Sequence, residues 1–461
     1  MSIATLLIVI FVVGYLSITL EHNLKLDKAV PALLMGTLMW AVLAFGFNEG
    51  WLSIVDHYGD VYNLTSGEEE EQLYGFKRNL IYHFSAAAEI LFFLIGAMTI
   101  VEIIDLHRGF AIIKNMITHK NKRRLLWAMG ILAFVLSAII DNLTATIILV
   151  TLLRKILVKR SYRIWFAGMI IIAANAGGAW SPIGDVTTTM LWIGGKVTAV
   201  GLSEYLILPS LVCFVVPFFI AGYLKPFRGK AIRKELIADV EAHRLLSSKK
   251  MLWTGLAAIA FVPIFKGITG LPPYLGMMFS LGVVWMVSEY VKPEKNLPRN
   301  QKHVYSTHKA LSKIEFSSIL FFLGILLAVG VLESVVWGSI NGEEVGALRY
   351  AAESISVAIP NMDVVVLLLG ALSALIDNVP MVAATMGMYT YEIDHPIWHF
   401  IAYSAGTGGS LLVIGSAAGV AAMGMEKIDF IWYLKKIAWL ALVGFLAGAG
   451  VFIIIEKFFY A

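Results

Sequence analysis

The chain has 461 residues, of which 59% are hydrophobic and 15% are charged, with a mean hydropathy of +0.78. A soluble domain would carry about 25% charged residues, so this composition excludes one and indicates an all-α polytopic membrane protein. The formal net charge of +4 is small and predicts no nucleic-acid partner, and the single cysteine excludes an intrachain disulfide.

Apolar stretches of membrane-spanning length follow one another along the chain. Eight are uninterrupted, near residues 1–20, 29–47, 83–104, 203–224, 251–265, 274–290, 316–336 and 430–455. Two more, near 164–200 and 397–425, contain glycine-rich segments, which predicts broken helices. The last two, 125–153 and 362–390, each carry an Asp-Asn pair in the middle.

Lys and Arg residues predict the orientation, because they gather in cytoplasmic loops. Thirty of the 36 lie in the loops 21–28, 105–124, 154–163, 225–250, 291–313 and 426–436. The segment 125–153 is therefore basic at both ends, and as one helix it would be about 44 Å long, against a hydrocarbon core of about 30 Å. We expect a re-entrant hairpin with its tip at Asp141-Asn142, and a mirrored hairpin with its tip at Asp377-Asn378.

The two halves of the chain have the same order of elements in opposite orientation. Ser137-Ala-Ile-Ile-Asp-Asn142 recurs as Ser373-Ala-Leu-Ile-Asp-Asn378, and the glycine breaks recur in the same order. This predicts an inverted-topology repeat with about ten spanning helices, two re-entrant hairpins and two broken helices. The first repeat is 1–224, the cytoplasmic linker is 225–250 and the second repeat is 251–461.

Carboxylates at bilayer depth are costly, at least about 2.5 kcal/mol on insertion scales, which favours a functional role for them. Together with amides, hydroxyls and unwound backbone carbonyls they form a site for a hard cation. The candidate cation- and proton-binding residues are Asp141, Asn142, Thr144, Asn175, Ser181, Asp185, Thr187, Thr188, Asp377, Asn378, Thr407, Ser410 and Ser416. Among these, we expect sodium at Asp141, Asn142, Asp185, Asp377 and Asn378. Backbone unwinding is expected at Gly177, Gly178, Gly184, Gly408, Gly409 and Gly415.

The same carboxylates predict coupling to protons. Burial raises the pKa of a carboxyl group and a bound cation lowers it, so the two ions compete for one group. Glu89, in the third spanning segment, is a candidate proton relay. An alternative for the aspartates is that they only cap the helices that follow, since Asp and Asn are good N-caps.

These segments resemble the NhaD-type sodium/proton antiporters of the ion transporter superfamily. The resemblance rests on the Ile-Asp-Asn tips, on Asn175-Ala-Gly-Gly-Ala-Trp-Ser-Pro-Ile-Gly-Asp185 followed by Val-Thr-Thr-Thr, and on the second glycine break. It implies exchange of Na⁺ and Li⁺ for H⁺ across a bacterial inner membrane by alternating access, with no other cofactor. It also implies a homodimer, and adds Ser373 to the site.

Two other functions remain open on the sequence. A dicarboxylate or oxyanion transporter of the same superfamily would favour neutral or basic tips, and these tips are acidic. An intramembrane aspartyl protease would need Asp141 and Asp377 as a dyad that shares one proton. Each aspartate here has an adjacent Asn and no Gly-x-Gly-Asp sequence occurs. We therefore expect a carrier and no enzymatic activity.

Overall fold

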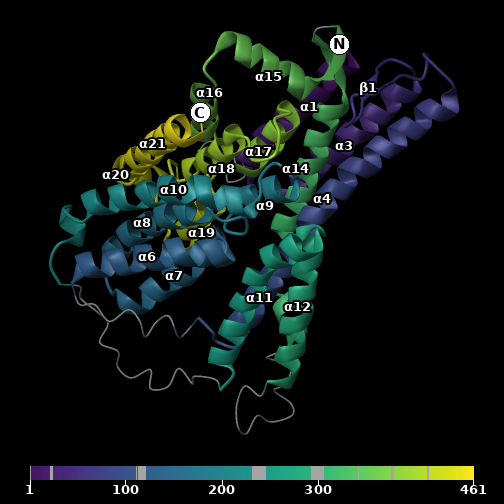
Figure 1. The fold of residues 1–461 in the computed structure, drawn as a ribbon. Helices are drawn as coiled ribbons and strands as arrows, with labels where there is room; N and C mark the ends of the chain where they lie inside the picture. The colour runs from purple at the N-terminus through teal and green to yellow at the C-terminus, as the bar shows by residue number, and fades with distance from the viewer. Residues whose placement is uncertain are drawn as a thin grey trace. The chain divides into compact units, whose positions relative to one another are not determined.

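A computed structural model of the chain describes residues 2–20, 24–110, 112, 121–230, 246–291, 306–340, 342–374, 378–412 and 415–460. These residues are mostly α-helical, with two small β-hairpins (Figure 1). Among them, seven helices are long and apolar enough to cross a membrane, judged by length and composition. Contacts divide the chain into two compact units, Met1–Phe92 with Glu315–Val365 and Val379–Glu392, and Phe93–Ile314 with Val366–Asn378 and Ile393–Ala461.

The first unit has its core between α3 (Ala29–Asn48) and α14 (Phe316–Ser334). These two helices touch through their backbones, because a Cβ on Gly36 would lie 2.5 Å from the carbonyl oxygen of Gly324. Trp40 Nε1 also donates a hydrogen bond to Leu327 O at 2.9 Å. The other elements of this unit are α1 (Ile3–Thr19), the start of α4 (Glu69–Leu106), α15 (Ala347–Ala358), most of α17 (Asn378–Met388), and the antiparallel pairs β1–β2 (Ile54–Val55, Val61–Tyr62) and β3–β4 (Val336–Ile340, Glu343–Gly346).

The second unit contains the first hairpin and both broken helices. The hairpin is α6 (Lys122–Ile140) and α7 (Asn142–Ile156), and the broken helices are α8 (Arg160–Gly178) with α9 (Val186–Ile193), and α18 (Pro396–Gly408) with α19 (Ala417–Glu426). In Figure 1, α6, α7, α8 and α19 lie side by side, and their contacts agree. The unit also holds the rest of α4, α10 (Ala199–Ala221), η1 (Lys225–Phe227), α11 (Ser248–Thr269), α12 (Pro273–Tyr290), α13 (Thr307–Leu311), the end of α16 (Met362–Leu372), α20 (Phe430–Lys436), α21 (Ala438–Ile455) and η3 (Glu456–Tyr460).

One helix is much longer than its predicted span. The apolar stretch 83–104 is only the later part of α4, which has 38 residues and would be about 57 Å long. Its first turn holds Glu69, Glu70 and Glu71, which favour a helix N-terminus electrostatically. Hydropathy detects only the part of a helix that lies in lipid, so the polar extension could not be predicted from it.

Backbone geometry recurs at equivalent places in the two halves of the chain. Asp185 begins α9 with φ −146° and ψ 150°, and Ser416 begins α19 with φ −145° and ψ 149°. A Cβ on Gly177 would overlap the carbonyl of Phe134, and one on Gly408 would overlap that of Gly370. These glycines therefore pack equivalent hairpins and broken helices against each other in the two halves.

Candidate functional site

Asp141 forms the tip of the first hairpin and begins α7. Its carboxylate accepts hydrogen bonds from the backbone N–H and the hydroxyl of Thr144, both at 2.8 Å. The residue has φ 90° and ψ 156°, a conformation that is almost confined to glycine and costs a non-glycine residue on the order of 1–3 kcal/mol. Asp141 therefore does cap a helix, as the alternative interpretation held, but in a strained conformation typical of functional sites.

The first broken helix turns where two glycines meet. A Cβ on Gly184 would lie 2.7 Å from the Cα of Gly178, so only glycine permits this approach. Asp185 then caps α9: its Oδ1 accepts from the N–H of Thr187 at 2.9 Å and from the Thr187 hydroxyl at 3.0 Å. The glycines thus turn the chain so that Asp185 faces the start of a new half-helix.

Threonine hydroxyls hold the backbone of this break. Thr188 Oγ1 donates to Ser181 O at 2.7 Å and to Asp185 O at 2.9 Å. Thr189 Oγ1 donates to Pro182 O at 2.9 Å. Ser181 O and Asp185 O also accept backbone N–H groups, from Gly184 at 3.2 Å and from Thr189 at 3.0 Å, so the threonine hydroxyls add to the backbone bonds of the break. In this structure Thr188 and Ser181 therefore shape the break.

Five buried side chains form one hydrogen-bonded group, which we call the amide cluster: Asn142, Asn175, Asp185, Ser410 and Ser416. The Asn142 amide donates to the Asp185 carboxylate and, at 3.1 Å, to Asn175 Oδ1. The Asn175 amide donates to the hydroxyls of Ser410 and Ser416, each at 2.9 Å. The cluster joins the first hairpin tip and both broken helices, and so residues of both repeats.

The second hairpin supplies a partial counterpart. Ser373 Oγ donates to Gly370 O at 2.8 Å and to Ala405 O at 3.3 Å, and Ser137 Oγ donates to Ala174 O at 2.6 Å. Each serine thus ties a hairpin arm to the neighbouring broken helix. Asn378 is buried at the start of α17. Asp377 lies outside the described residues, so its predicted place in the site remains a prediction.

Other predicted residues have separate roles or places. The Thr407 hydroxyl donates to Tyr403 O within α18 at 2.6 Å, and Ser416 caps α19 by accepting from Gly419 N at 3.1 Å. Glu89 is half-buried in the first unit, whereas the cluster belongs to the second. Its role as a relay stays a prediction.

The sequence interpretation missed two residues near the cluster. Ser137 occupies the same place in its motif as Ser373, so comparing the two motifs could have found it. Tyr433 OH donates to Ser410 O at 2.8 Å and is fully buried. The sequence shows no signal for Tyr433, because α20 is distant in the chain from the glycine break it contacts.

The arrangement offers a cation hard oxygen ligands of mixed charge. Asn142, which follows Asp141 at the hairpin tip, donates its amide N–H to the Asp185 carboxylate, and the Thr187 hydroxyl donates to the same carboxylate at 3.0 Å. The N-termini of α7, α9 and α19 begin at Asp141, Asp185 and Ser416, and helix N-termini favour negative charge. Among the described residues, no three His, Cys, Asp or Glu side chains gather as in a transition-metal site. Binding of an alkali cation by these residues, in competition with a proton, stays a prediction.

Comparison with known proteins places this architecture. The family described as "Citrate transporter" matches residues 6–398. Sodium/proton antiporter 1 of Arabidopsis thaliana is 40% identical, over 97% of this chain and 72% of that protein. The Na⁺/H⁺ antiporter NhaD of Alkalimonas amylolytica is 30% identical, over 96% of this chain and 89% of that protein. The chain belongs to the NhaD-type sodium/proton antiporters.

NhaD-type membership agrees with the superfamily predicted from the motifs and makes the chain a multi-pass membrane carrier, not an enzyme. The fold agrees too. The crystal structure of the Alcanivorax borkumensis YdaH transporter, which has an unusual topology, is similar with a TM-score of 0.57 at 12% identity, over 94% of this chain and 98% of that one. The relatives and the matching family, which are all transporters, do not favour the protease interpretation.

Proposed function

We propose that this NhaD-type chain exchanges Na⁺, and also Li⁺, for H⁺ by alternating access, with the ions bound in turn at Asp141 and Asp185. The observation that carries the proposal is the buried amide cluster, where the Asp185 carboxylate accepts from Asn142 and Thr187. A bare buried carboxylate is costly, and either a proton or a cation neutralises it. If the carrier reorients only when neutralised, the result is exchange.

The second tip and the membrane setting complete the proposal. Asp377 and Asn378 would add ligands from the opposite side, and Glu89 would relay protons. The protein would lie in a bacterial inner membrane as a homodimer, with its basic loops in the cytoplasm, and would use no cofactor besides the transported ions. The names of the relatives, which are sodium/proton antiporters from a plant and from bacteria, support the choice of ions.

An anion carrier is the second candidate, because the matching family is described as citrate transporters. The cluster speaks against it: its described bonds are donated by the Asn142 and Asn175 amides, and its one charged member is the Asp185 carboxylate. A negatively charged substrate would meet repulsion there instead of a cationic partner.

The test uses a pH gradient in everted membrane vesicles. We expect added Na⁺ to dissipate the gradient and K⁺ to do so weakly or not at all. Asp141→Asn should abolish the Na⁺ response, because asparagine keeps the size and the capping ability of aspartate but carries no charge. Asp377→Asn should do the same. Normal Na⁺ responses in both variants would refute the carboxylate site, and a response to succinate but not to Na⁺ would favour the anion carrier.

A further inference from the structure

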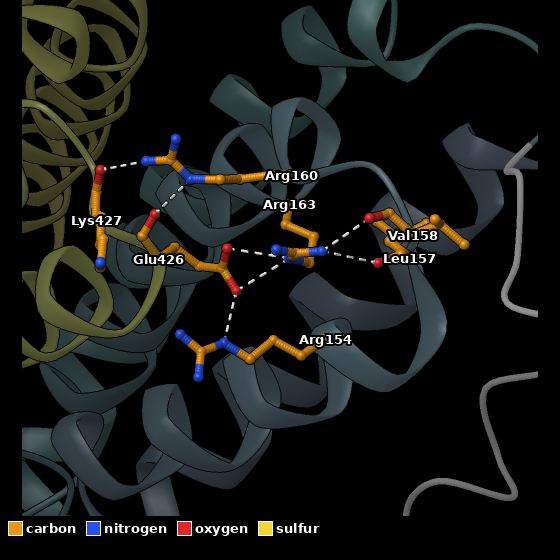
Figure 2. A network of polar contacts seen from close by, with 7 residues as sticks. All are labelled: Arg154, Leu157, Val158, Arg160, Arg163, Glu426 and Lys427. Atoms are coloured by element: carbon orange, nitrogen blue, oxygen red, sulfur yellow. Dashed lines mark hydrogen bonds and ion pairs between the residues drawn. The ribbon is translucent and has the colours of Figure 1, made fainter.

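An ion-pair network lies at the opposite ends of the helices that form the amide cluster (Figure 2). Glu426 accepts from Arg154 Nε at 2.8 Å and from Arg163 Nε at 3.0 Å, although its side chain is only 1% exposed. Arg160 Nε donates to the backbone carbonyl of Glu426 at 3.1 Å. We call these four residues the arginine clasp. None of them belongs to the predicted cation site.

The clasp also completes the hydrogen bonding of two helix C-termini. Arg160 donates to Lys427 O at 2.6 Å, just after α19 ends. Arg163 donates to Leu157 O at 3.2 Å and to Val158 O at 2.9 Å, just after α7 ends. Guanidinium groups suit these carbonyls, because helix C-termini carry partial negative charge. The clasp therefore fixes where α7 and α19 end relative to α8.

Three helices run from the clasp to the amide cluster, and each contributes a residue to both. In α7 these are Arg154 and Asn142, which are about 18 Å apart along the helix axis. In α8 they are Arg163 and Asn175, again about 18 Å apart.

In α19 the clasp residue is Glu426, and Ser416 caps the helix about 15 Å away. The three helices also pack against one another. A sliding motion of α7 or α19 would break the bonds at both ends together, so the clasp restrains the register of the ligands.

A backbone hydrogen bond lies at the equivalent place of the other broken helix pair. Asp394 lies as many residues before Gly408 as Arg163 lies before Gly177, so the two are equivalent in the repeats. In the same way, Lys196 lies as many residues after Gly184 as Lys427 lies after Gly415. There the N–H of Asp394 donates to Lys196 O at 3.0 Å, just after α9. Both repeats thus anchor the end of one broken helix to the start of the other, which a chance surface pair would not reproduce.

We propose that Glu426 is a positioning residue for cation binding: through Arg154 and Arg163 it holds α7, α8 and α19 in the register that assembles the amide cluster. The inference rests on the proposed sodium/proton exchange at that cluster. Loss of the clasp should weaken cation binding more than it slows the loaded carrier, because the clasp sets the positions of the residues that bind the cation.

The experiment measures Na⁺-dependent exchange in proteoliposomes. Glu426→Gln should raise the Na⁺ concentration for half-maximal exchange by on the order of tenfold, equivalent to about 1.4 kcal/mol, and leave the maximal rate within about twofold. Because that variant removes the carboxylate that pairs with Arg154 and Arg163, a double variant, Arg163→Met with Glu426→Met, replaces the more buried of the two ion pairs (side chains 19% and 1% exposed) by apolar groups and should fold. We expect the same rise in the half-maximal Na⁺ concentration in the double variant.

The matched control is Glu102→Gln, which breaks the ion pair with Lys313 Nζ (3.7 Å) in the same unit but in none of the three helices. It should keep the wild-type half-saturation. An unchanged half-saturation in the double variant, or a lower maximal rate with unchanged half-saturation, would overturn the inference.

Deuterium exchange distinguishes this inference from the proposed function. Both Glu426 variants should show faster amide exchange than the wild type in the first turns of α7 and α19. If the wild-type protein showed no Na⁺-dependent exchange, the proposed function would be refuted. The exchange data would still decide whether the clasp holds the cluster, and wild-type protection in the variants would refute it.

Discussion

Asp185 and Ser416 show how one backbone position serves two purposes. Both begin a half-helix with nearly the same φ and ψ, and both caps accept from the backbone N–H two or three residues later. Only Asp185 brings a charge, which Asn142 and Thr187 solvate. Capping of a half-helix at this position therefore does not require a carboxylate.

This difference predicts the outcome of Asp185→Ser. Serine caps a helix about as well as aspartate, so the variant should fold with a thermal stability close to that of the wild type. It should lose the Na⁺-dependent dissipation of a pH gradient, because no carboxylate remains to exchange proton for cation in the amide cluster. Melting in detergent and the vesicle assay measure the two properties separately. Exchange at the wild-type level would show that Asp185 is only a cap.

Among single residues, the sequence motif identified Asn142, Asn175, Asp185, Ser410 and Ser416 as candidates, and the structure joins all five in one network. The motif did not predict that Asn175 would bond to serines of the other repeat. That contact depends on the packing of α8 near α18 and α19, and no local pattern encodes a contact across more than 230 residues.

Close helix packing explains the glycines at the level of elements. Gly177 of α8 lies against the backbone of α6 at Phe134, and Gly408 of α18 lies against Gly370 of α16. The sequence interpretation expected these glycines to unwind the backbone. Gly177 is instead the last residue but one of α8, and Gly408 is the last residue of α18. Their described contacts are with the hairpins. Gly178 is the last residue of α8, and Gly184 lies between α8 and α9, where the two glycines approach each other.

Substitution of these glycines by alanine therefore has a predicted cost. Gly177→Ala should lower the free energy of unfolding by about 1–3 kcal/mol, because the added methyl overlaps a carbonyl oxygen that belongs to a packed helix. Gly424→Ala in α19 is the control: a Cβ there meets nothing within 4 Å, and alanine favours a helix by about 1 kcal/mol. The melting temperature in detergent should fall for Gly177→Ala and rise for Gly424→Ala, each relative to the wild type. Equal melting temperatures for the two variants would contradict the contact between Gly177 and the backbone of Phe134.

At the scale of the whole molecule, the repeats and the compact units do not coincide. Each unit takes helices from both 1–224 and 251–461. The repeat boundaries come from element order, whereas the units come from contacts between distant helices. Sequence periodicity could predict the first and not the second.

A buried histidine connects distant helices and predicts a pH dependence of stability. His107 follows α4, and its ring nitrogens contact the hydroxyls of Ser247 at 2.8 Å and Ser288 at 3.1 Å. Burial lowers the pKa of His107 to about 4, from 6.5. Between these values the unfolded chain binds more protons than the folded one. The stability that neutral His107 contributes is therefore complete above pH 6.5 and is lost as the pH falls toward 4.

His107→Gln should make this acid loss of stability shallower, since glutamine keeps hydrogen-bonding groups but does not bind a proton in this range. The measurement is the melting temperature between about pH 7.5 and about pH 5, with exposed His308→Gln as the control. A pH profile identical to that of the wild type would contradict a neutral buried His107.

The sequence alone determined what is local or periodic: the apolar spans, the hairpin tip at Asp141, the glycine breaks and the repeated order of elements. These follow from hydropathy, charge placement and backbone preference, which act over a few residues. Only the tertiary structure decided which oxygens meet at the amide cluster, that Glu426 joins α7, α8 and α19, and that α4 extends far beyond its apolar part. Those features depend on how helices distant in the chain pack, and packing is set by the shapes of surfaces that no single segment contains.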